Sequence, residues 1–289
     1  NSNYFYQVTA RNSSTTGLII WSGNGSASSQ RNFTAKINST AITFSVASFA
    51  TWYNVVITGD GSNLTAYVDG TQVATTAIST LFPTLTYTTK IGSNKDGTNY
   101  FLNGKIDETS IFNYALSSAQ VLEIYNNGKP GDLDNFSGTA PISWWRLGEN
   151  AYFNDVPAFT VPNSISGAPN GTGSGSITTM ISADAPGTYA NGIGTNLNIL
   201  DRVGDAALST SNSQSYNMIP SDISPYVPQY VGDQIANNFS MTFDGVNDYI
   251  NVGNPTELQL TGAFSVSLWM KTNITGSRVI ISKDSNTSN

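Results

Sequence analysis

Three oxygen-bearing side chains, Asp244, Asn247 and Asp248, lie close together in the sequence and could bind a cation. Carboxylate and amide oxygens, together with the carbonyl oxygens of a turn, are the ligands that Ca²⁺ takes in proteins. A second interpretation stays open. Asp244 and Gly245 form a favourable tight-turn pair, which explains these residues without a metal if Asp248 is solvated. The segment therefore predicts either a calcium site or an ordinary turn.

The absence of two residue types excludes several other kinds of chemistry. The chain has no histidine and no cysteine. Serine–histidine and cysteine–histidine catalysis within one chain are therefore excluded. Ordinary zinc sites are excluded too, because they need imidazole or thiolate ligands. The net charge of −7 repels phosphate backbones, so we expect no nucleic-acid partner.

The composition is typical of an all-β protein with many turns. Only 11% of the 289 residues are charged, and 26 are glycine. The hydrophobic fraction of 39%, rich in Tyr and Phe, argues against disorder and is sufficient for a buried core. No apolar run approaches the length needed to cross a bilayer, so we expect no membrane span.

Residues 264–271 give the clearest strand signal. Apolar and polar side chains alternate, as in a half-buried antiparallel strand, and Trp269 lies on the same face as two serines. A tight hairpin is predicted at Asp69-Gly70, because a two-residue Asp-Gly loop adopts positive φ at both positions. In the strand predicted at residues 264–271, the apolar face is formed by Phe264, Val266, Leu268 and Met270.

One short helix is predicted after residue 116. Ser117 is a good N-cap, Gln120 completes a capping box, and Gly128 is expected to end the helix. Further on, Trp144 and Trp145 are adjacent within a predicted strand, so one indole should point inward and the other outward. The outward indole could stack on a sugar or on a neighbouring subunit. Alternatively, the helix or the insertion covers it, and we favour this second interpretation.

Several of these segments together resemble the laminin-G-like, concanavalin-A-like jelly-roll family. The resemblance implies an all-β antiparallel sandwich, a jelly roll, with one short helix and a long irregular insertion. The order is circularly permuted relative to the family, because the segments that resemble its first half follow those that resemble its second half. The first half is resembled by residues 144–149, 243–252, 264–271 and 280–283, and the second half by residues 52–56, 64–70, 90–92, 104–108 and 113–121.

The resemblance and the turn-rich composition of the middle of the chain give a division into four parts. We expect the last part to continue into residue 1 of the same copy or of the next copy. The parts are residues 1–129, the second part of the jelly roll; 130–177, a linker and its first strand; 178–238, an irregular insertion; and 239–289, its early strands.

The family is mostly non-catalytic, so the resemblance implies that the chain is not an enzyme. Its related glucanases carry a Glu-x-Asp-x-x-Glu run on one strand, and this chain has no such run. Asp107 and Glu108 are adjacent, so in a regular strand they would point to opposite faces. Hydrolysis of a glycosidic bond needs two carboxylates that face it together.

The resemblance also suggests site residues. Asp107 lies in the strand that resembles the family's site region, which adds it to the candidate calcium ligands Asp244, Asn247 and Asp248. Trp269 is expected to line a concave, lectin-like surface and to contact a glycan. Ten N-x-S/T sequons occur, about as many as chance allows in this composition. The candidate glycosylation sites are Asn12, Asn32, Asn63 and Asn135.

Two functions from different classes are consistent with these features. The first is a non-enzymatic structural protein, a repeat unit or subunit of an extracellular fibre whose partners are other copies of itself, joined head to tail. The alternative is a carbohydrate-binding module of a bacterial surface adhesin or a phage virion protein. The expected location is extracellular or at the cell surface, or the virion in the alternative.

Overall fold

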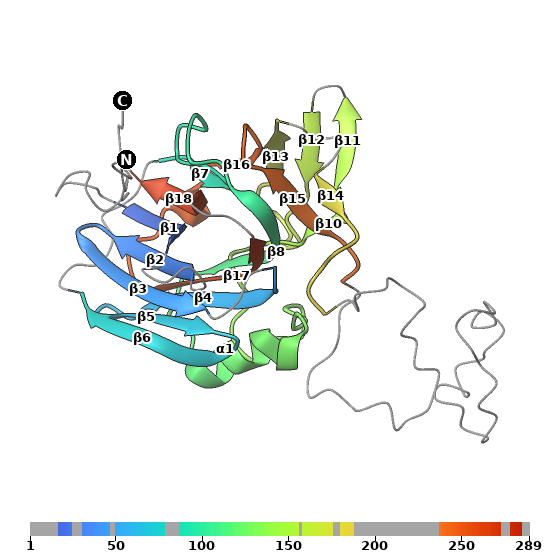
Figure 1. The fold of residues 1–289 in the computed structure, drawn as a ribbon. Helices are drawn as coiled ribbons and strands as arrows, with labels where there is room; N and C mark the ends of the chain where they lie inside the picture. Colours follow the sequence, from blue (N-terminus) through green and yellow to red (C-terminus); the bar gives the residue numbers. More distant parts are fainter. Residues whose placement is uncertain are drawn as a thin grey trace, which may run out of the picture.

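The computed structural model describes residues 17–24, 31–46, 50–78, 87–155, 158–175, 180–187, 237–272 and 278–284. These residues form two antiparallel sheets that pack face to face, with one short helix on the outside (Figure 1). The predicted all-β sandwich is therefore confirmed. In the described part of the chain, no helix is long and apolar enough to cross a membrane.

The first sheet, called sheet A, has nine strands, all paired antiparallel. Its strands come from both ends of the described chain and from its middle. In spatial order they are β11 (Tyr152–Asp155), β12 (Ala158–Val161), β13 (Gly171–Ser174), β16 (Tyr249–Gly253), β7 (Thr89–Ile91), β18 (Arg278–Asp284), β1 (Gly17–Asn24), β2 (Arg31–Ile37) and β3 (Thr40–Val46).

The second sheet, called sheet B, has eight strands, with β9 (Ser143–Trp145) paired to β8 beside the main path. Strand β10 (Leu147–Asn150) follows β9 in the chain. Along the main path the order is β14 (Ile181–Ser182), β15 (Ser240–Asp244), β8 (Asn103–Phe112), β17 (Phe264–Thr272), β4 (Tyr53–Gly59), β5 (Asn63–Val68) and β6 (Thr71–Ala77).

The main core fills the space between the two sheets. The apolar face predicted for β17 is confirmed, because all four of its side chains belong to this core. Burying the apolar face of each sheet against the other is what stabilises a sandwich. The largest side chains of this core include Phe33, Trp145, Phe159, Phe243 and Phe264.

A second, smaller core lies on the outer face of sheet B, under the helix α1 (Ser118–Tyr125) (Figure 1). Val121 and Ile124 of the helix pack here with Trp144. Trp145 lies in the main core, so the prediction of one inward and one outward indole is confirmed, as is the cover by the helix. Covering a sheet face with an amphipathic helix removes its apolar surface from water.

The predicted local signals mostly hold. The capping box is confirmed, with the Ser117 side chain accepting from the Gln120 N–H. The helix ends earlier than predicted: Asn126 takes the left-handed conformation at φ 41° and a 3-10 turn (Asn126–Gly128) follows. The Asp69-Gly70 hairpin is also confirmed, with φ of 49° and 76° joining β5 to β6.

The middle of the chain contains more regular structure than predicted. Residues 143–174 form five short strands, β9 to β13, where one strand was expected. Within the predicted insertion 178–238, residues 181–182 form the edge strand β14, and residues 188–236 lie outside the described residues. These extra strands are only two to four residues long, so the two-residue alternation in the sequence is too short to identify them.

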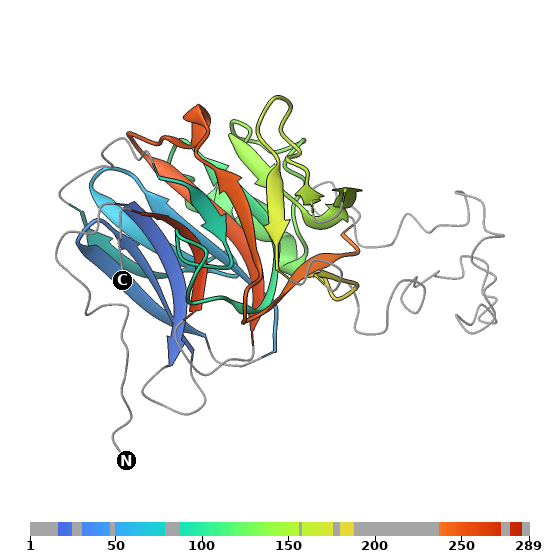
Figure 2. The same ribbon diagram turned by 90° about the horizontal axis from the view of Figure 1, so that it is seen from above.

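Residues 237–284, called here the C-terminal segment, are interleaved with the rest of the chain. β17 lies between β8 and β4, and β18 lies between β7 and β1. In Figure 2 the orange-to-red strands of this segment lie between the blue strands and the green and yellow strands. Strands from the two ends of the described chain therefore meet in one sandwich within a single chain, with Gly17 opposite Asp284.

Candidate functional site

A β-bulge in β8 places two neighbouring carboxylates on the outer side of sheet B. Along β17 the partners Ser267 and Trp269 are two residues apart, whereas their partners on β8, Ser110 and Asp107, are three apart. The extra residue is accommodated where Glu108 adopts φ of 47°. A bulge interrupts the alternation of side chains. The prediction that Asp107 and Glu108 point to opposite faces is therefore wrong.

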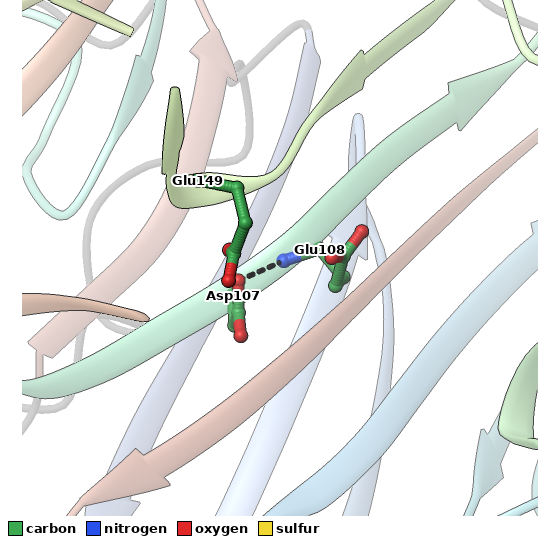
Figure 3. A group of neighbouring side chains, drawn as sticks. All are labelled: Asp107, Glu108 and Glu149. Atoms are coloured by element: carbon green, nitrogen blue, oxygen red, sulfur yellow. Dashed lines mark hydrogen bonds between the residues drawn. The ribbon is translucent and has the colours of Figure 1, made fainter. Parts of the chain in front are cut away.

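A third carboxylate joins them from a distant part of the sequence. Glu149 on β10 reaches toward Asp107, as Figure 3 shows. One carboxylate oxygen from each of Asp107, Glu108 and Glu149 lies within 4.8 Å of the other two. We call these three side chains the carboxylate cluster. Asp107 and Glu108 are buried, and Glu149 is partly buried.

Glu108 is neutralised by one cation. Arg146 Nε donates to Glu108 Oε1 at 2.9 Å, and Trp144 Nε1 donates to Glu108 Oε2 at 2.5 Å. The guanidinium also lies 5.5 Å from the centroid of the Trp144 ring. Burial raises the pKa of Glu108 to about 7, although the charge and the hydrogen bond of Arg146 act in the opposite direction.

Asp107 and Glu149 accept hydrogen bonds from uncharged groups, and neither has an ion pair among the described residues. Asp107 accepts from the Glu108 N–H at 2.8 Å and from Asn237 Nδ2 at 3.0 Å. Glu149 Oε1 accepts from the backbone N–H groups of Asn238 and Phe239. Burial raises the pKa of both groups, and for Asp107 the charges of Glu108 and Glu149 raise it further.

Two oxygen atoms at the cluster lack a partner. Glu149 Oε2 and Asn237 Oδ1 are both buried, with no hydrogen-bond partner among the described residues. A buried polar atom without a partner costs roughly 1–3 kcal/mol. The cluster therefore combines three carboxyl groups, one contacting cation and two buried oxygens that lack a partner in the described part of the chain.

Residues 1–122 match a family model, Laminin_G_3, described as the Concanavalin A-like lectin/glucanases superfamily. The resemblance stated from the sequence is confirmed over this range. Searches of curated proteins and of solved structures found no match. The matched range contains Asp107 and Glu108, whereas Glu149 and Asn237 lie outside it. The superfamily name covers both binding proteins and glucanases, so the match alone does not choose between them.

The sandwich does not bring the four predicted calcium ligands together. Asp244 accepts from the N–H groups of Val246 and Asn247, and Asp248 accepts from the Asp244 N–H at 3.0 Å. These bonds are those of a tight turn between β15 and β16. Asp107 is elsewhere, because Asp244 pairs with Asn103, four residues along β8 from Asp107. These hydrogen bonds are consistent with the turn interpretation, but its expectation that Asp248 is solvated is wrong, because Asp248 is only 1% exposed.

Trp269 does not lie on an open surface. It is only 2% exposed, and its ring stacks on Tyr125 of the helix, with centroids 5.8 Å apart. The expectation that it lines an accessible lectin-like face must therefore be corrected, because Tyr125 of the helix covers it. The sequence pattern placed Trp269 on the outer face but could not show what covers that face.

The candidate glycosylation sites occupy different environments. Asn63 and Asn135 are exposed, at the start of β5 and in the loop after the helix. Asn32 on β2 is half-buried and accepts from the Ser45 hydroxyl at 2.6 Å. Asn12 lies outside the described residues. Glycosylation at these four positions stays a prediction.

Asp184 anchors residues 180–187 to sheet B beside the cluster. Its carboxylate accepts from Lys105 Nζ at 2.6 Å, Lys271 Nζ at 2.9 Å and Trp52 Nε1 at 3.0 Å. Partial burial raises the pKa of Asp184, but the hydrogen bonds from these three groups outweigh it and lower the pKa to about 2. This anchor joins β8, β17 and the segment that precedes residue 188.

We expect Asp184→Asn to lower the free energy of unfolding by about 1 kcal/mol at pH 7. The pKa shift corresponds to roughly 2.5 kcal/mol, reduced here because the side chain is 38% exposed. The folded pKa lies below the unfolded value of 3.8, so this stability is present above about pH 4 and is lost as the pH falls toward 2. Urea titrations at pH 7, 4 and 2 measure it. A difference between parent and variant that stays constant over this range would contradict the assignment.

Proposed function

We propose that the chain is a non-enzymatic structural module, a repeat unit or subunit of an extracellular head-to-tail assembly of laminin-G-like sandwiches. One observation carries the proposal. In the described part of the chain, none of the four strands of the C-terminal segment pairs with another strand of that segment. Each of them pairs only with strands from residues 17–182.

Such a segment cannot form a sheet by itself. β15 pairs with β14 and β8, β16 with β13 and β7, β17 with β8 and β4, and β18 with β7 and β1. Alone, all four strands would expose unpaired backbone groups and apolar faces. The segment is complementary to residues 17–182, and those residues exist in every copy of the chain. The same pairings can therefore form within one chain or between two.

Completion between copies is a heterologous contact. The donating surface is the C-terminal segment, and the accepting surface is the set of strands β1, β4, β7, β8, β13 and β14. A contact between two different surfaces of identical subunits need not close into a ring, so it can produce filaments. This is the physical basis for a fibre built from such modules.

The carboxylate cluster supports a non-enzymatic role. Retaining glycosidases hold their two carboxyl groups about 5–5.5 Å apart, and inverting enzymes hold them about 6.5–9.5 Å apart, on either side of the sugar bond. Here one oxygen from each of the three carboxylates lies within 4.8 Å of the other two, and Asp107 is fully buried. Glu108 uses both oxygens on Trp144 and Arg146. A sugar ring has no room between these groups.

Cysteine cross-linking can test whether the C-terminal segment of one copy pairs with the sheets of another. The parent chain has no cysteine, so only introduced cysteines can react. Lys105 on β8 and Lys271 on β17 lie opposite each other and are both partly exposed. Opposed residues of an antiparallel pair are close enough for a disulfide. We expect Lys105→Cys and Lys271→Cys chains, unfolded together, refolded at high concentration and oxidised, to yield a covalent dimer in non-reducing electrophoresis.

The matched control replaces Lys105→Cys by Lys36→Cys on β2, which changes the same residue type in the other sheet. Mixed with Lys271→Cys, it should give no more dimer than chance collisions produce. In the double variant Lys105→Cys/Lys271→Cys, pairing of β8 with β17 within one chain gives a monomer with an internal disulfide. If this double variant gives only monomer and the mixture gives no dimer, the head-to-tail proposal fails and the carbohydrate-binding module remains.

A further inference from the structure

A lysine side chain lies on the core face of sheet A. Lys283 on β18 is opposite Leu18 on β1, whose side chain belongs to the main core. Lys283 is only 6% exposed, and it has no ion pair in the part of the chain that the structure describes. A buried ammonium group without an opposite charge is costly, so burial favours the loss of its proton. The position of Lys283 therefore favours the neutral, nucleophilic form of the amine.

The hydrogen bonds of Lys283 also fit a neutral amine. Its Nζ donates to the Tyr87 carbonyl at 2.6 Å and to Asn254 Oδ1 at 2.7 Å. A neutral amine has two hydrogens, so these two acceptors use both of them and leave the nitrogen lone pair available for reaction. Burial lowers the pKa of Lys283 to about 8, so about a tenth of these side chains are neutral at pH 7.

The amine borders a small apolar cavity between the two sheets. Lys283 lines this cavity together with Thr89 and six apolar side chains, among them Leu18, Leu258 and Ile281. Among the described residues that line it, Lys283 is the only one that can carry a charge. Such surroundings disfavour the ammonium form and reduce the access of water to reacting groups.

The hydrogen-bond acceptor Asn254 is also an electrophile. Its carboxamide carbon, Cγ, is one C=O bond of about 1.2 Å from Oδ1, so Cγ lies within about 4 Å of Lys283 Nζ. Reacting atoms in a near-attack arrangement lie about 3–3.5 Å apart. A small rotation of either side chain therefore brings the amine nitrogen to the carboxamide carbon.

A threonine hydroxyl lies close to both groups. Strand β7 lies between β16 and β18 (Figure 1), and Thr89 on β7 pairs with Gly253, the residue before Asn254. Thr89 also lines the same cavity as Lys283. Its Oγ1 is buried and has no hydrogen-bond partner among the described residues. A hydroxyl both donates and accepts a proton, so Thr89 is placed to carry one between the amine and the carboxamide.

We propose that Lys283 and Asn254 form an isopeptide bond, an amide bond between two side chains, with Thr89 as the proton carrier. The lone pair of Lys283 Nζ attacks Cγ of Asn254, so that the Nζ–Cγ bond forms and the Cγ–Nδ2 bond breaks. One amine proton passes to the departing nitrogen, which leaves as ammonia. The step therefore needs no oxidant, reductant or further reactant. Holding the two groups together supplies the high effective concentration that a slow reaction between an amine and an amide requires.

The bond closes a covalent loop from residue 254 to residue 283, which contains all of β17. Both reacting residues belong to the C-terminal segment. The bond therefore forms whether that segment completes its own sandwich or the sandwich of another copy. A covalent loop reduces the conformational freedom of the unfolded segment, as a disulfide does, in a chain that has no cysteine.

Mass spectrometry of the full chain, refolded and incubated at pH 9, tests the bond. A linked chain has lost one ammonia, so its mass is about 17 Da below that of its sequence. Asparagines also lose ammonia by attack of the next backbone N–H, but Pro255 has no N–H and closes this route at Asn254. Protease fragments analysed by tandem mass spectrometry should therefore include one in which Lys283 is covalently joined to Asn254.

Three variants separate the parts of the reaction. Lys283→Met removes the amine and Asn254→Ala removes the electrophile, so neither should give the linked fragment. Thr89→Val keeps the shape of its side chain but removes the hydroxyl, and it should slow the linkage by at least about tenfold. Circular dichroism monitors the folding of each variant. The linked fragment of the parent decides the proposal even if one variant fails to fold.

Two matched controls change the same residue types elsewhere in the sandwich. Lys90→Met removes another buried lysine, on β7, and Asn63→Ala removes an exposed asparagine at the start of β5. Both should give the linked fragment to the same extent as the parent. A parent chain that keeps the full mass of its sequence and gives no linked fragment overturns the proposal. A Thr89→Val chain that links at the rate of the parent overturns the role of the hydroxyl.

Discussion

A chain that ends at residue 236 should show no cooperative unfolding transition. It lacks β17, which joins β8 to β4, and β18, which joins β7 to β1, so both sheets are divided. Each buried apolar side chain lost removes about 1.5–3 kcal/mol, and the net stability of a domain is only about 5–15 kcal/mol. Removing eight of them is therefore enough to unfold the chain. Those lost from the main core include Phe243, Ile250, Phe264, Val266, Leu268, Met270, Ile280 and Ile281.

Circular dichroism during heating measures this loss, and co-expression tests its cause. Residues 237–289, produced together with residues 1–236, should restore a cooperative transition and co-purify with them, because the pairings need no covalent link. A control chain keeps both parts and replaces residues 188–236 with a short Gly/Ser linker. Asn237 Nδ2 donates to the Pro186 carbonyl at 3.1 Å, so the two ends that the linker must join lie close together. We therefore expect this control chain to stay folded. A cooperative transition in residues 1–236 alone would show that the C-terminal segment is dispensable.

Arg146→Met should lower the free energy of unfolding by about 3–5 kcal/mol at pH 8. The substitution keeps much of the side-chain volume but removes the only described cation that contacts the carboxylate cluster. At pH 8 Glu108 is mostly ionised, since its pKa is about 7. Breaking a buried ion pair by removing one partner leaves an uncompensated buried charge, which is the costly case. Chemical denaturation of parent and variant gives the difference.

The double variant Arg146→Met/Glu108→Gln separates charge from packing. Replacing both partners of a buried pair by neutral groups is often nearly neutral for stability. The amide oxygen introduced by Glu108→Gln can still accept from the Trp144 indole, so we expect the double variant to recover most of the loss. A double variant as unstable as Arg146→Met alone would mean that Arg146 stabilises by packing over Trp144 rather than by its charge.

Local chemistry made the strands, the hairpin and the helix predictable. Two positive-φ positions at Asp69 and Gly70, a capping box at Ser117 and strict alternation from Phe264 each depend on neighbouring residues only. At these three places the sequence pattern and the structure agree. The helix end at Tyr125 differs because Asn126 adopts the left-handed conformation before Gly128 is reached.

The carboxylate cluster could not be predicted in this way. It depends on a bulge at Glu108, which is seen only in the pairing of β8 with β17. It also depends on Glu149, which is distant in sequence. No local pattern marks either. The cover over Trp269 is a similar case, since alternation assigns a face but the docking of Tyr125 decides whether water reaches it. Only tertiary contacts determine both features.

The interleaving of the C-terminal segment also sets the time at which the protein can fold. Gly17 lies opposite Asp284, and β4 must wait for β17 before its second edge is paired. Contacts of such large sequence separation make folding slow, because a long loop must close before they form. During synthesis, strands β1, β4, β7 and β8 keep edges unpaired until the strands of the C-terminal segment follow. We therefore expect these strands of the nascent chain to need protection by chaperones, and the sandwich to become protease-resistant only after β18 has emerged.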